Sequence, residues 1–192
     1  GRIYGYEKIQ SVAPSVQVRA IFTNEERAFE RRIKNILVSA GFSEVYNYSF
    51  YSHCDARLSQ LGSEKHLELE NPMNPDQALM RKSLIPNTLK NVQENLKNFK
   101  EFQIFEIGRV YHAENSALPK EKSALLGAVV MEKDKIIFHE AKKYLDFIFE
   151  NLGIEGVIYQ NHKLIEGYHQ ATLWSEIRSA EIKIDGTQES VG

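Results

Sequence analysis

The stretch FQIFEIGRVYHAE at residues 102–114 decides how the rest of the chain is interpreted. Its first residues are apolar at odd and even positions alike, and successive side chains of a strand point to opposite faces. The pattern therefore predicts an inner strand that is covered on both sides. The same alternation places Glu106, His112 and Glu114 on one face and Arg109 on the other.

The ionisable groups of this strand leave two interpretations open. In the first, it is a central strand whose polar end reaches solvent. In the second, its charged groups form the floor of a ligand site. Gly108 predicts a bulge or a close backbone approach in either case, because glycine carries no side chain that would obstruct one.

Composition sets broad limits on the class of protein. A chain of 192 residues with 42% hydrophobic content suits one domain, or one domain and a fragment, with enough apolar residues for a core. The 24 Lys and Arg against 26 Asp and Glu leave a net charge of -2, which gives no general surface for polyanions. Any contact with RNA would need a local basic patch.

Cysteine usage and hydropathy predict the compartment. The single cysteine, Cys54, excludes an internal disulfide and cannot form a metal cluster by itself, so we expect a reducing compartment, the cytoplasm. No apolar run approaches the roughly 20 residues that span a bilayer, and the N-terminus lacks a signal-peptide pattern, so we expect no membrane partner. Because the chain starts without Met and ends within an expected hairpin, we expect a piece of a larger protein.

Residues 1–20 are predicted to be an extended lead-in, and residues 21–192 a core domain that is truncated at its C-terminus. A helix follows the lead-in, with Thr23 as N-cap, Glu26 completing a capping box and Gly41 as C-cap. The apolar stripe of this helix consists of Phe29, Ile33, Ile36, Leu37 and Ala40.

Residues 44–51, EVYNYSFY, are predicted to form one strand, because aromatic residues and Val have high strand propensity. A period of two places Tyr46, Tyr48 and Phe50 on the same face. These rings belong either to the core of the domain or to a surface that faces a partner.

Shorter elements follow in the middle of the chain. We expect a short helix or loop at 52–62, a short strand at 67–70 and a proline-fixed turn at 71–76. Arg81 should end a strand, and Pro86 should lie in the first turn of a helix. The predicted buried stripe of this helix is Leu89, Val92, Leu96 and Phe99.

The C-terminal half predicts further strands around one helix. We expect a polar loop at 114–122, a buried strand at 123–131, a helix that ends at Gly153, a strand at 157–159 and a strand at 180–185 with an Asp185-Gly186 hairpin turn. Strands in series with few helices favour an α+β fold, with a mostly antiparallel sheet and helices to one side, over a parallel doubly wound fold.

Signals of catalysis are mostly missing. The chain has no GxxxxGK[ST] phosphate loop, no HExxH, no GxSxG and no Cys/His cluster. Its six histidines are scattered without the spacing of metal ligands. We therefore predict no catalytic residue and no metal site in this chain.

Five stretches of the sequence carry a family resemblance. They are FEIGRVYH at 105–112, the preceding ENPMNPDQALMRKSLIPNTLKNVQENL, the opening GRIYGYEKI, GFSEVYNYSF and RSAEIKIDG. Four of them, in their order along the chain, closely resemble the synthetase-like core of the beta subunit of bacterial phenylalanyl-tRNA synthetase. The opening GRIYGYEKI, in residues 1–20, resembles the end of the small domain that precedes this core in the same subunit. Together the five stretches cover most of the chain. The resemblance implies a fold like that of the class II aminoacyl-tRNA synthetases.

The resemblance also implies a function. Enzymes of this family have two alpha and two beta subunits and join phenylalanine to its tRNA with ATP and magnesium. The alpha subunit would carry the chemistry, and the beta core would act as a scaffold for it. Expected partners are therefore the alpha subunit and, through the whole complex, tRNA(Phe), with no cofactor held by this chain. Acidic magnesium ligands of the preceding domain lie just upstream of RIYGY in the family and are absent here.

Two signature motifs of the class can be compared with this chain. Helix, Gly-Phe turn and strand resemble the first motif, which serves subunit association, although Tyr48 stands where that motif has proline. The resemblance thus implies an interface at Phe42, Tyr46, Tyr48 and Phe50. The second motif holds the ATP alpha-phosphate with an arginine, and here its degenerate positions are His112 and Glu114. The third motif has no counterpart, and Ile177 replaces the glycine of a GRSAEI-like string.

Two rival functions stay open at this point. An autonomous ATP-dependent ligase would use Arg81, Arg109 and Glu114, although Arg81 could equally form an ion pair with a nearby carboxylate. An RNA-binding module would use the basic surface of the first helix, where a solvated or partner-facing surface is the alternative. This basic surface consists of Arg27, Arg31, Arg32 and Lys34.

Overall fold

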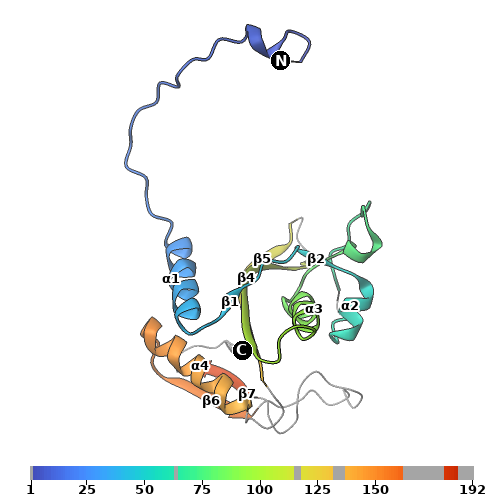
Figure 1. The fold of residues 1–192 in the computed structure, drawn as a ribbon, viewed down its shortest axis with the longest axis vertical. Helices are drawn as coiled ribbons and strands as arrows, with labels where there is room; N and C mark the ends of the chain where they lie inside the picture. Colours follow the sequence, from blue (N-terminus) through green and yellow to red (C-terminus); the bar gives the residue numbers. More distant parts are fainter. Residues whose placement is uncertain (1, 63–64, 115–117, 132–136, 162–179, 186–192) are drawn as a thin grey trace.

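The computed structural model describes residues 2–62, 65–114, 118–131, 137–161 and 180–185. Figure 1 shows the arrangement of the elements. In chain order they are η1 (Tyr6–Lys8), α1 (Glu25–Ser39), β1 (Ser43–Glu44), β2 (Phe50–Tyr51), α2 (His53–Leu58), η2 (Pro75–Gln77), β3 (Leu79–Met80), α3 (Ile85–Asn95), β4 (Phe102–His112), β5 (Lys120–Val130), α4 (Ile137–Leu152), β6 (Val157–Asn161) and β7 (Ala180–Ile184).

The central sheet has the strand order β1-β4-β5 (Figure 1). β4 is its inner strand, as predicted from residues 102–114. It pairs antiparallel with β5 along its whole length and parallel with β1, where Ser43 lies opposite Ile104. The pairs β2-β3 and β6-β7 are antiparallel. Mostly antiparallel pairing agrees with the α+β class, and β1 is the parallel exception.

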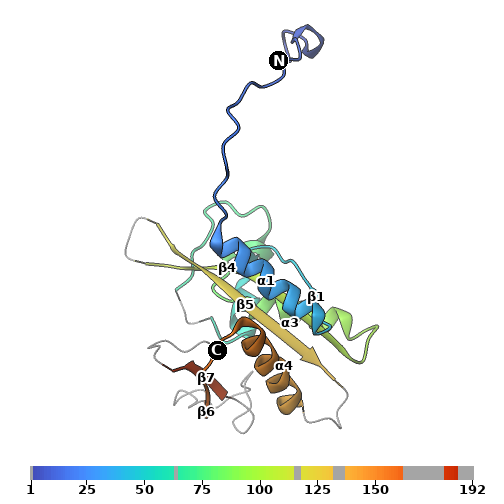
Figure 2. The same cartoon turned by 90° about the vertical axis from the view of Figure 1, so that its left-hand side faces the viewer.

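Helices cover both faces of β4, so the expectation of helices to one side is wrong. α1 and α4 pack against the face that carries Phe105, where Leu37 and Ile148 complete a buried cluster. α3 lies across the opposite face, as the two perpendicular views show (Figures 1 and 2). Ile104 and Phe105 are consecutive and both buried. A strand with apolar residues on both faces needs a covering layer on each.

The first helix begins one residue later than its sequence pattern predicts. Asn24, not Thr23, is the N-cap, and its Oδ1 accepts a hydrogen bond from the Arg27 backbone N–H at 3.0 Å. At the other end Gly41 follows the C-cap with φ +91°, a conformation that favours glycine. Nearly all described residues before α1 are exposed, and this stretch extends away from the body in both views (Figures 1 and 2).

The single strand predicted at 44–51 is wrong. The chain instead forms β1 beside β4, leaves that sheet, and forms β2 beside β3. Residues 45–49 connect the two short strands. Strand propensity is high throughout this stretch, but the pairing partner changes within it, so one continuous ladder cannot form.

α3 forms as predicted, with Pro86 in its first turn, but the face that it buries is different. Leu89, Leu96 and Phe99 are exposed, while Asn87 and Thr88 are buried. Part of the apolar side of α3 lines an open groove of about 180 Å³ against β5, together with Leu126, Gly127 and Ala128. Polar partners on the sheet side of α3, described below, explain the buried asparagine.

Other boundaries differ in smaller ways. β5 begins at Lys120, inside the predicted loop at 114–122, and its first half is exposed where a buried strand was predicted. The stretch at 67–70 forms an isolated bridge from Glu68 to Leu79 instead of a strand. α4 ends as predicted, with Gly153 following it, and β6 is longer than the predicted 157–159. Gly186 of the predicted hairpin turn, and Ile177, lie outside the described residues.

The start of α2 supports a prediction about pH. Ser52 and Asp55 form a capping box, and Lys90 lies 2.6 Å from the Asp55 carboxylate. Burial alone would raise the pKa of Asp55, but hydrogen bonds from Lys90 and Ser52 outweigh it and hold the pKa below 3.8. A lowered pKa stabilises the fold above the unfolded-state pKa, and this contribution is lost as the pH falls through the folded-state pKa.

We therefore expect Asp55→Asn to lower the free energy of unfolding by about 1 kcal/mol at neutral pH. The difference from wild type should shrink as the pH falls below about 4 and vanish once the wild-type carboxyl is protonated. Thermal unfolding of both proteins across this range measures it. A difference that stays constant down to acid pH would contradict the assigned role of the charge.

Among the described helices, none is long and apolar enough to cross a membrane.

Candidate functional site

A buried ion pair links the end of β3 to the middle of β4. Arg81 Nη1 lies 2.6 Å from Glu106 Oε1, and the two side chains are 4% and 0% exposed. Arg81 Nε also donates a hydrogen bond to the carbonyl of Arg109 at 2.9 Å. Between the two alternatives that the sequence left open for Arg81, the ion pair is therefore confirmed.

Asparagines occupy the other side of the Glu106 carboxylate. Asn47 Nδ2 donates to Glu106 Oε2 at 2.7 Å, and Asn91 Nδ2 of α3 donates to Asn47 Oδ1 at 3.0 Å. Both carboxylate oxygens of Glu106 thus have partners within the protein. These contacts favour the first interpretation of the strand, a central strand of the core, over the floor of a ligand site.

Gly108 accommodates the Arg81 side chain. The register of β4 with β5 continues through Gly108 without a bulge, so the predicted bulge is wrong. The close approach comes from a side chain: a Cβ at Gly108 would lie 2.2 Å from Arg81 Nη2 and 3.2 Å from Glu106 Oε1. A methyl group at this position would displace the guanidinium from its carboxylate.

Gly108→Ala is therefore expected to lower the free energy of unfolding by about 1–3 kcal/mol. Gly127→Ala is the matched control on β5, because its Cβ would meet Phe42 at 3.5 Å, an ordinary contact. Chemical denaturation of the two variants measures the difference. Equal stability of both would show that Arg81 moves aside without cost.

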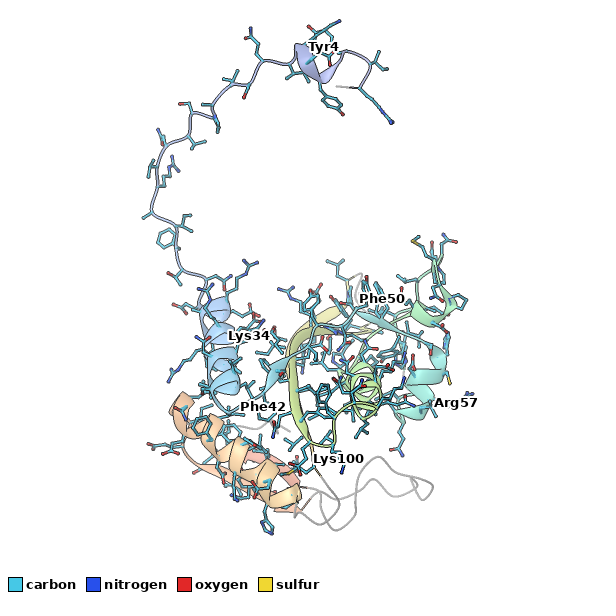
Figure 3. All side chains as sticks on the ribbon, in the orientation of Figure 1. Tyr4, Lys34, Phe42, Phe50, Arg57 and Lys100 are labelled. Atoms are coloured by element: carbon cyan, nitrogen blue, oxygen red, sulfur yellow. The ribbon has the colours of Figure 1, made fainter. Side chains whose placement is uncertain are left out.

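The four aromatic residues of the predicted interface do not share one surface. Tyr46 and Tyr48 are 90% and 76% exposed, and Phe50 is half-buried. Phe42 is 6% exposed and packs edge-on against Tyr144 of α4, with 5.0 Å between ring centroids. Figure 3 shows Phe42 near the end of α1 and Phe50 well away from it on β2. Phe42 is thus a core residue, and the prediction that it lies at an interface is wrong.

The degenerate motif positions lie where β4 ends and the chain turns back toward β5. His112 is the last residue of β4 and lies opposite Lys120, while Glu114 is 4.0 Å from Lys120 Nζ. An imidazole is short and cannot clamp a phosphate with two parallel hydrogen bonds as arginine does. In the part of the chain that the structure describes, no three or more His, Cys, Asp or Glu side chains gather as a metal site would need. The residues described at this end of the strand pair therefore do not fit bound ATP and magnesium.

The two arginines that an autonomous ligase would use, Arg81 and Arg109, do not lie in one site. Arg81 is buried on the Glu106 face, whereas Arg109 points to the opposite face and pairs with Glu121 at 2.7 Å. That hydrogen bond raises the pKa of Arg109. Two opposite faces of one strand cannot form one active site.

The basic surface of α1 is partly used within the protein. Arg32 donates to the carbonyl of Asn151 at 2.5 Å, and Lys34 forms an ion pair with Glu44. Glu25, Glu26 and Glu30 lie on the same helix, so negative charges accompany the remaining cations. These contacts weaken the case for an RNA-binding surface.

Sequence reasoning missed the asparagines. Asn87, Asn91 and Asn95 recur at intervals of four along α3 and so lie on one face of this helix. Asn47 stands between two tyrosines at an inward position of an alternating stretch. The sequence pattern that could have predicted these contacts is an asparagine repeated every fourth residue of a helix, together with a single asparagine among aromatic residues elsewhere in the chain.

Comparisons with known proteins agree with one another. Residues 9–192 match the family model described as "Phenylalanyl tRNA synthetase beta chain CLM domain". The phenylalanine–tRNA ligase beta subunit of Solibacter usitatus is 40% identical over 128 residues, which are 67% of this chain and 17% of that protein. The corresponding subunit of Syntrophus aciditrophicus is 31% identical over 206 aligned positions, covering 100% of this chain and 25% of that protein. The chain spans about a quarter or less of these relatives.

Solved structures share the fold. The pyrrolysyl-tRNA synthetase of Desulfitobacterium hafniense superimposes with a TM-score of 0.63 at 13% identity, covering 85% of this chain and 56% of that one. A second structure, of PylSc from the same organism, gives a TM-score of 0.60 at 15% identity, with 73% and 49% covered. Both are pyrrolysyl-tRNA synthetases, and at this identity the likeness shows the fold alone.

Proposed function

Because the chain belongs to the family of the phenylalanyl-tRNA synthetase beta chain CLM domain, we propose that it is a non-catalytic scaffold that binds the alpha subunit of a phenylalanine–tRNA ligase. The activity of the complex, which attaches phenylalanine to tRNA(Phe) with ATP and magnesium, would take place in the alpha subunit. An assembly of two alpha and two beta subunits, located in the cytoplasm, belongs to the same proposal.

One observation carries the proposal for this chain. Tyr46 and Tyr48 are large aromatic side chains, two residues apart, and both are largely exposed to solvent. Tyrosine combines a wide apolar ring with a polar hydroxyl and is enriched among residues that dominate protein interfaces. We infer that the alpha subunit covers these two rings, which we call the tyrosine pair.

The absence of chemistry in this chain follows from its own residues. His112 replaces the arginine that holds the ATP phosphate in the class, and Glu114 pairs with Lys120. Arg81 and Glu106, the buried charges closest to the middle of β4, neutralise each other. At these positions of the described chain, the groups that a ligase would use are therefore replaced or already paired.

Co-purification with the alpha subunit tests the scaffold. A tagged form of this chain is co-expressed with its cognate alpha subunit, and we expect the two to elute together. A tRNA gel shift of this chain alone that weakens steeply with salt would favour the RNA-binding module instead. Failure to retain the alpha subunit, with the chain folded, would contradict the proposal.

Restoring the missing arginine tests the lack of catalysis. We expect His112→Arg to show no phenylalanine-dependent pyrophosphate exchange, because groups that act as a unit do not rescue one another singly. Wild type without the alpha subunit is the control. Exchange above that background would show that the ligase site is more complete than its geometry indicates.

A further inference from the structure

The segment that carries the tyrosine pair lies outside the sheets. The Val45 backbone N–H donates to the carbonyl of Phe105 at 2.8 Å. Among the described residues, this is the last backbone hydrogen bond between this segment and β4 before β2 begins at Phe50. Ser49 then accepts from the Arg81 backbone N–H at 3.0 Å. Residues 46–48 between these two points have no strand beside them in the described sheets.

Side chains hold this segment in place of a neighbouring strand. Asn47 donates from Nδ2 to Glu106 Oε2 at 2.7 Å and accepts from Asn91 Nδ2 at 3.0 Å. Asn87 Nδ2 donates to the carbonyl of Tyr48 at 2.9 Å and to that of Phe50 at 3.2 Å. Glu106 of β4 and Asn87 and Asn91 of α3 thus hold the segment through side-chain hydrogen bonds.

The hydrogen bonds of Asn47 also orient the tyrosine pair, because side chains along this segment alternate in direction. Asn47 points inward, and Tyr46 and Tyr48 on either side of it point outward. Because neighbouring side chains of an extended chain point to opposite faces, holding Asn47 down fixes the direction of both rings.

The Glu106 charge makes the arrangement specific. A fully buried carboxylate is costly unless it is hydrogen-bonded on both oxygens, and Asn47 supplies the bond that Arg81 does not. A different position of the segment would leave part of this charge without a partner. The segment therefore has one strongly preferred conformation.

We propose that Asn47, Asn87 and Glu106 are positioning residues that hold the tyrosine pair in the conformation that the alpha subunit binds. This inference rests on the proposed function. Preorganisation of this kind increases affinity because the partner does not have to order the segment on binding.

The first test needs no alpha subunit. Asn47→Ala should speed amide hydrogen exchange of a peptide covering residues 45–50 at least tenfold, while peptides from α4 keep the wild-type rate, because the change opens the segment locally. Asn95→Ala is the matched control, since Asn95 lies on the same helix and donates its hydrogen bond to the Asn91 carbonyl instead of to the segment. Unchanged exchange of the 45–50 peptide in Asn47→Ala would overturn the proposal.

The second test is a double-mutant cycle on alpha binding. We expect Asn47→Ala to weaken the binding of the alpha subunit roughly tenfold, the size expected for lost hydrogen bonds to a charged group. In a background of Tyr46→Ala with Tyr48→Ala, the same change should weaken binding no further, because its effect passes through the two rings. Asn87→Ala should behave in the same way and replaces Asn47→Ala if that variant does not fold.

The outcomes separate the inference from the function on which it rests. Loss of binding on changing the tyrosines, with Asn47→Ala and Asn87→Ala at wild-type affinity, would overturn the positioning role alone. An equal loss from Asn47→Ala with and without the tyrosines would also overturn it, because the effect would then be a general one. Wild-type affinity of the tyrosine variant would overturn the interface itself.

Discussion

Replacing Arg81 with methionine is expected to lower the free energy of unfolding by about 3–5 kcal/mol, because the change leaves the fully buried Glu106 carboxylate without its counter-charge. Arg109→Met is the matched control. Arg109 pairs with Glu121 at the surface, where such pairs contribute about 0–1 kcal/mol. Urea unfolding of both variants at neutral pH gives the comparison.

A second variant shows whether the loss comes from the unpaired charge. Arg81→Met combined with Glu106→Leu removes both charges, and we expect most of the lost stability to return, because apolar replacements of a buried pair are often neutral. Asn47 loses its acceptor in that variant, so some loss should remain. A loss below about 1 kcal/mol for Arg81→Met alone would contradict a buried, desolvated pair.

Phe42→Ala is expected to lower the free energy of unfolding by about 3–5 kcal/mol, because Phe42 fills the core between α1, β4 and α4. Tyr48→Ala, in which a ring of similar size is lost from the surface, should change it by less than about 0.5 kcal/mol. Thermal unfolding resolves the two, since about 1 kcal/mol shifts the midpoint by roughly 2–4 °C in a chain of this size.

This pair of variants separates core from interface among the aromatic residues near β1. A large loss of stability for Tyr48→Ala would place its ring in the core of the protein in solution. A small loss for Phe42→Ala would mean that the cluster with Leu37 and Phe105 closes over the gap.

Elements whose pattern is local could be predicted from the sequence. β4 carries apolar residues on both faces, which only an inner strand can bury, and it lies between β1 and β5. The last turn of α4 ends where Gly153 allows a positive φ. In both cases the residues of the element itself, and those next to it in the sequence, are enough to explain the observed structure.

Elements that depend on distant partners could not be predicted. The stretch EVYNYSFY has uniform strand propensity, yet the neighbour of this chain segment changes from β4 to β3 within it. α3 has the apolar residues that were predicted, but it turns Asn87 and Asn91 toward Tyr48 and Asn47, whose oxygens accept their hydrogen bonds. Local periodicity does not contain that information.

The candidate site shows the same limit. The sequence placed Arg81 near a carboxylate without saying which one, since Glu106 lies 25 positions away in the chain. It also grouped Phe42 with Tyr46, Tyr48 and Phe50 by proximity along the chain. The turn after α1 buries Phe42, whereas the crossing from β1 to β2 exposes the two tyrosines.

Titration of the alpha subunit into this chain measures whether the alpha subunit binds the tyrosine pair. The variant Tyr46→Ala with Tyr48→Ala should bind at least about 30-fold more weakly than wild type, because central aromatic residues of an interface contribute about 2 kcal/mol or more on truncation. Its unfolding midpoint should match that of wild type, because both rings are exposed. Wild-type affinity of this folded variant would contradict the account.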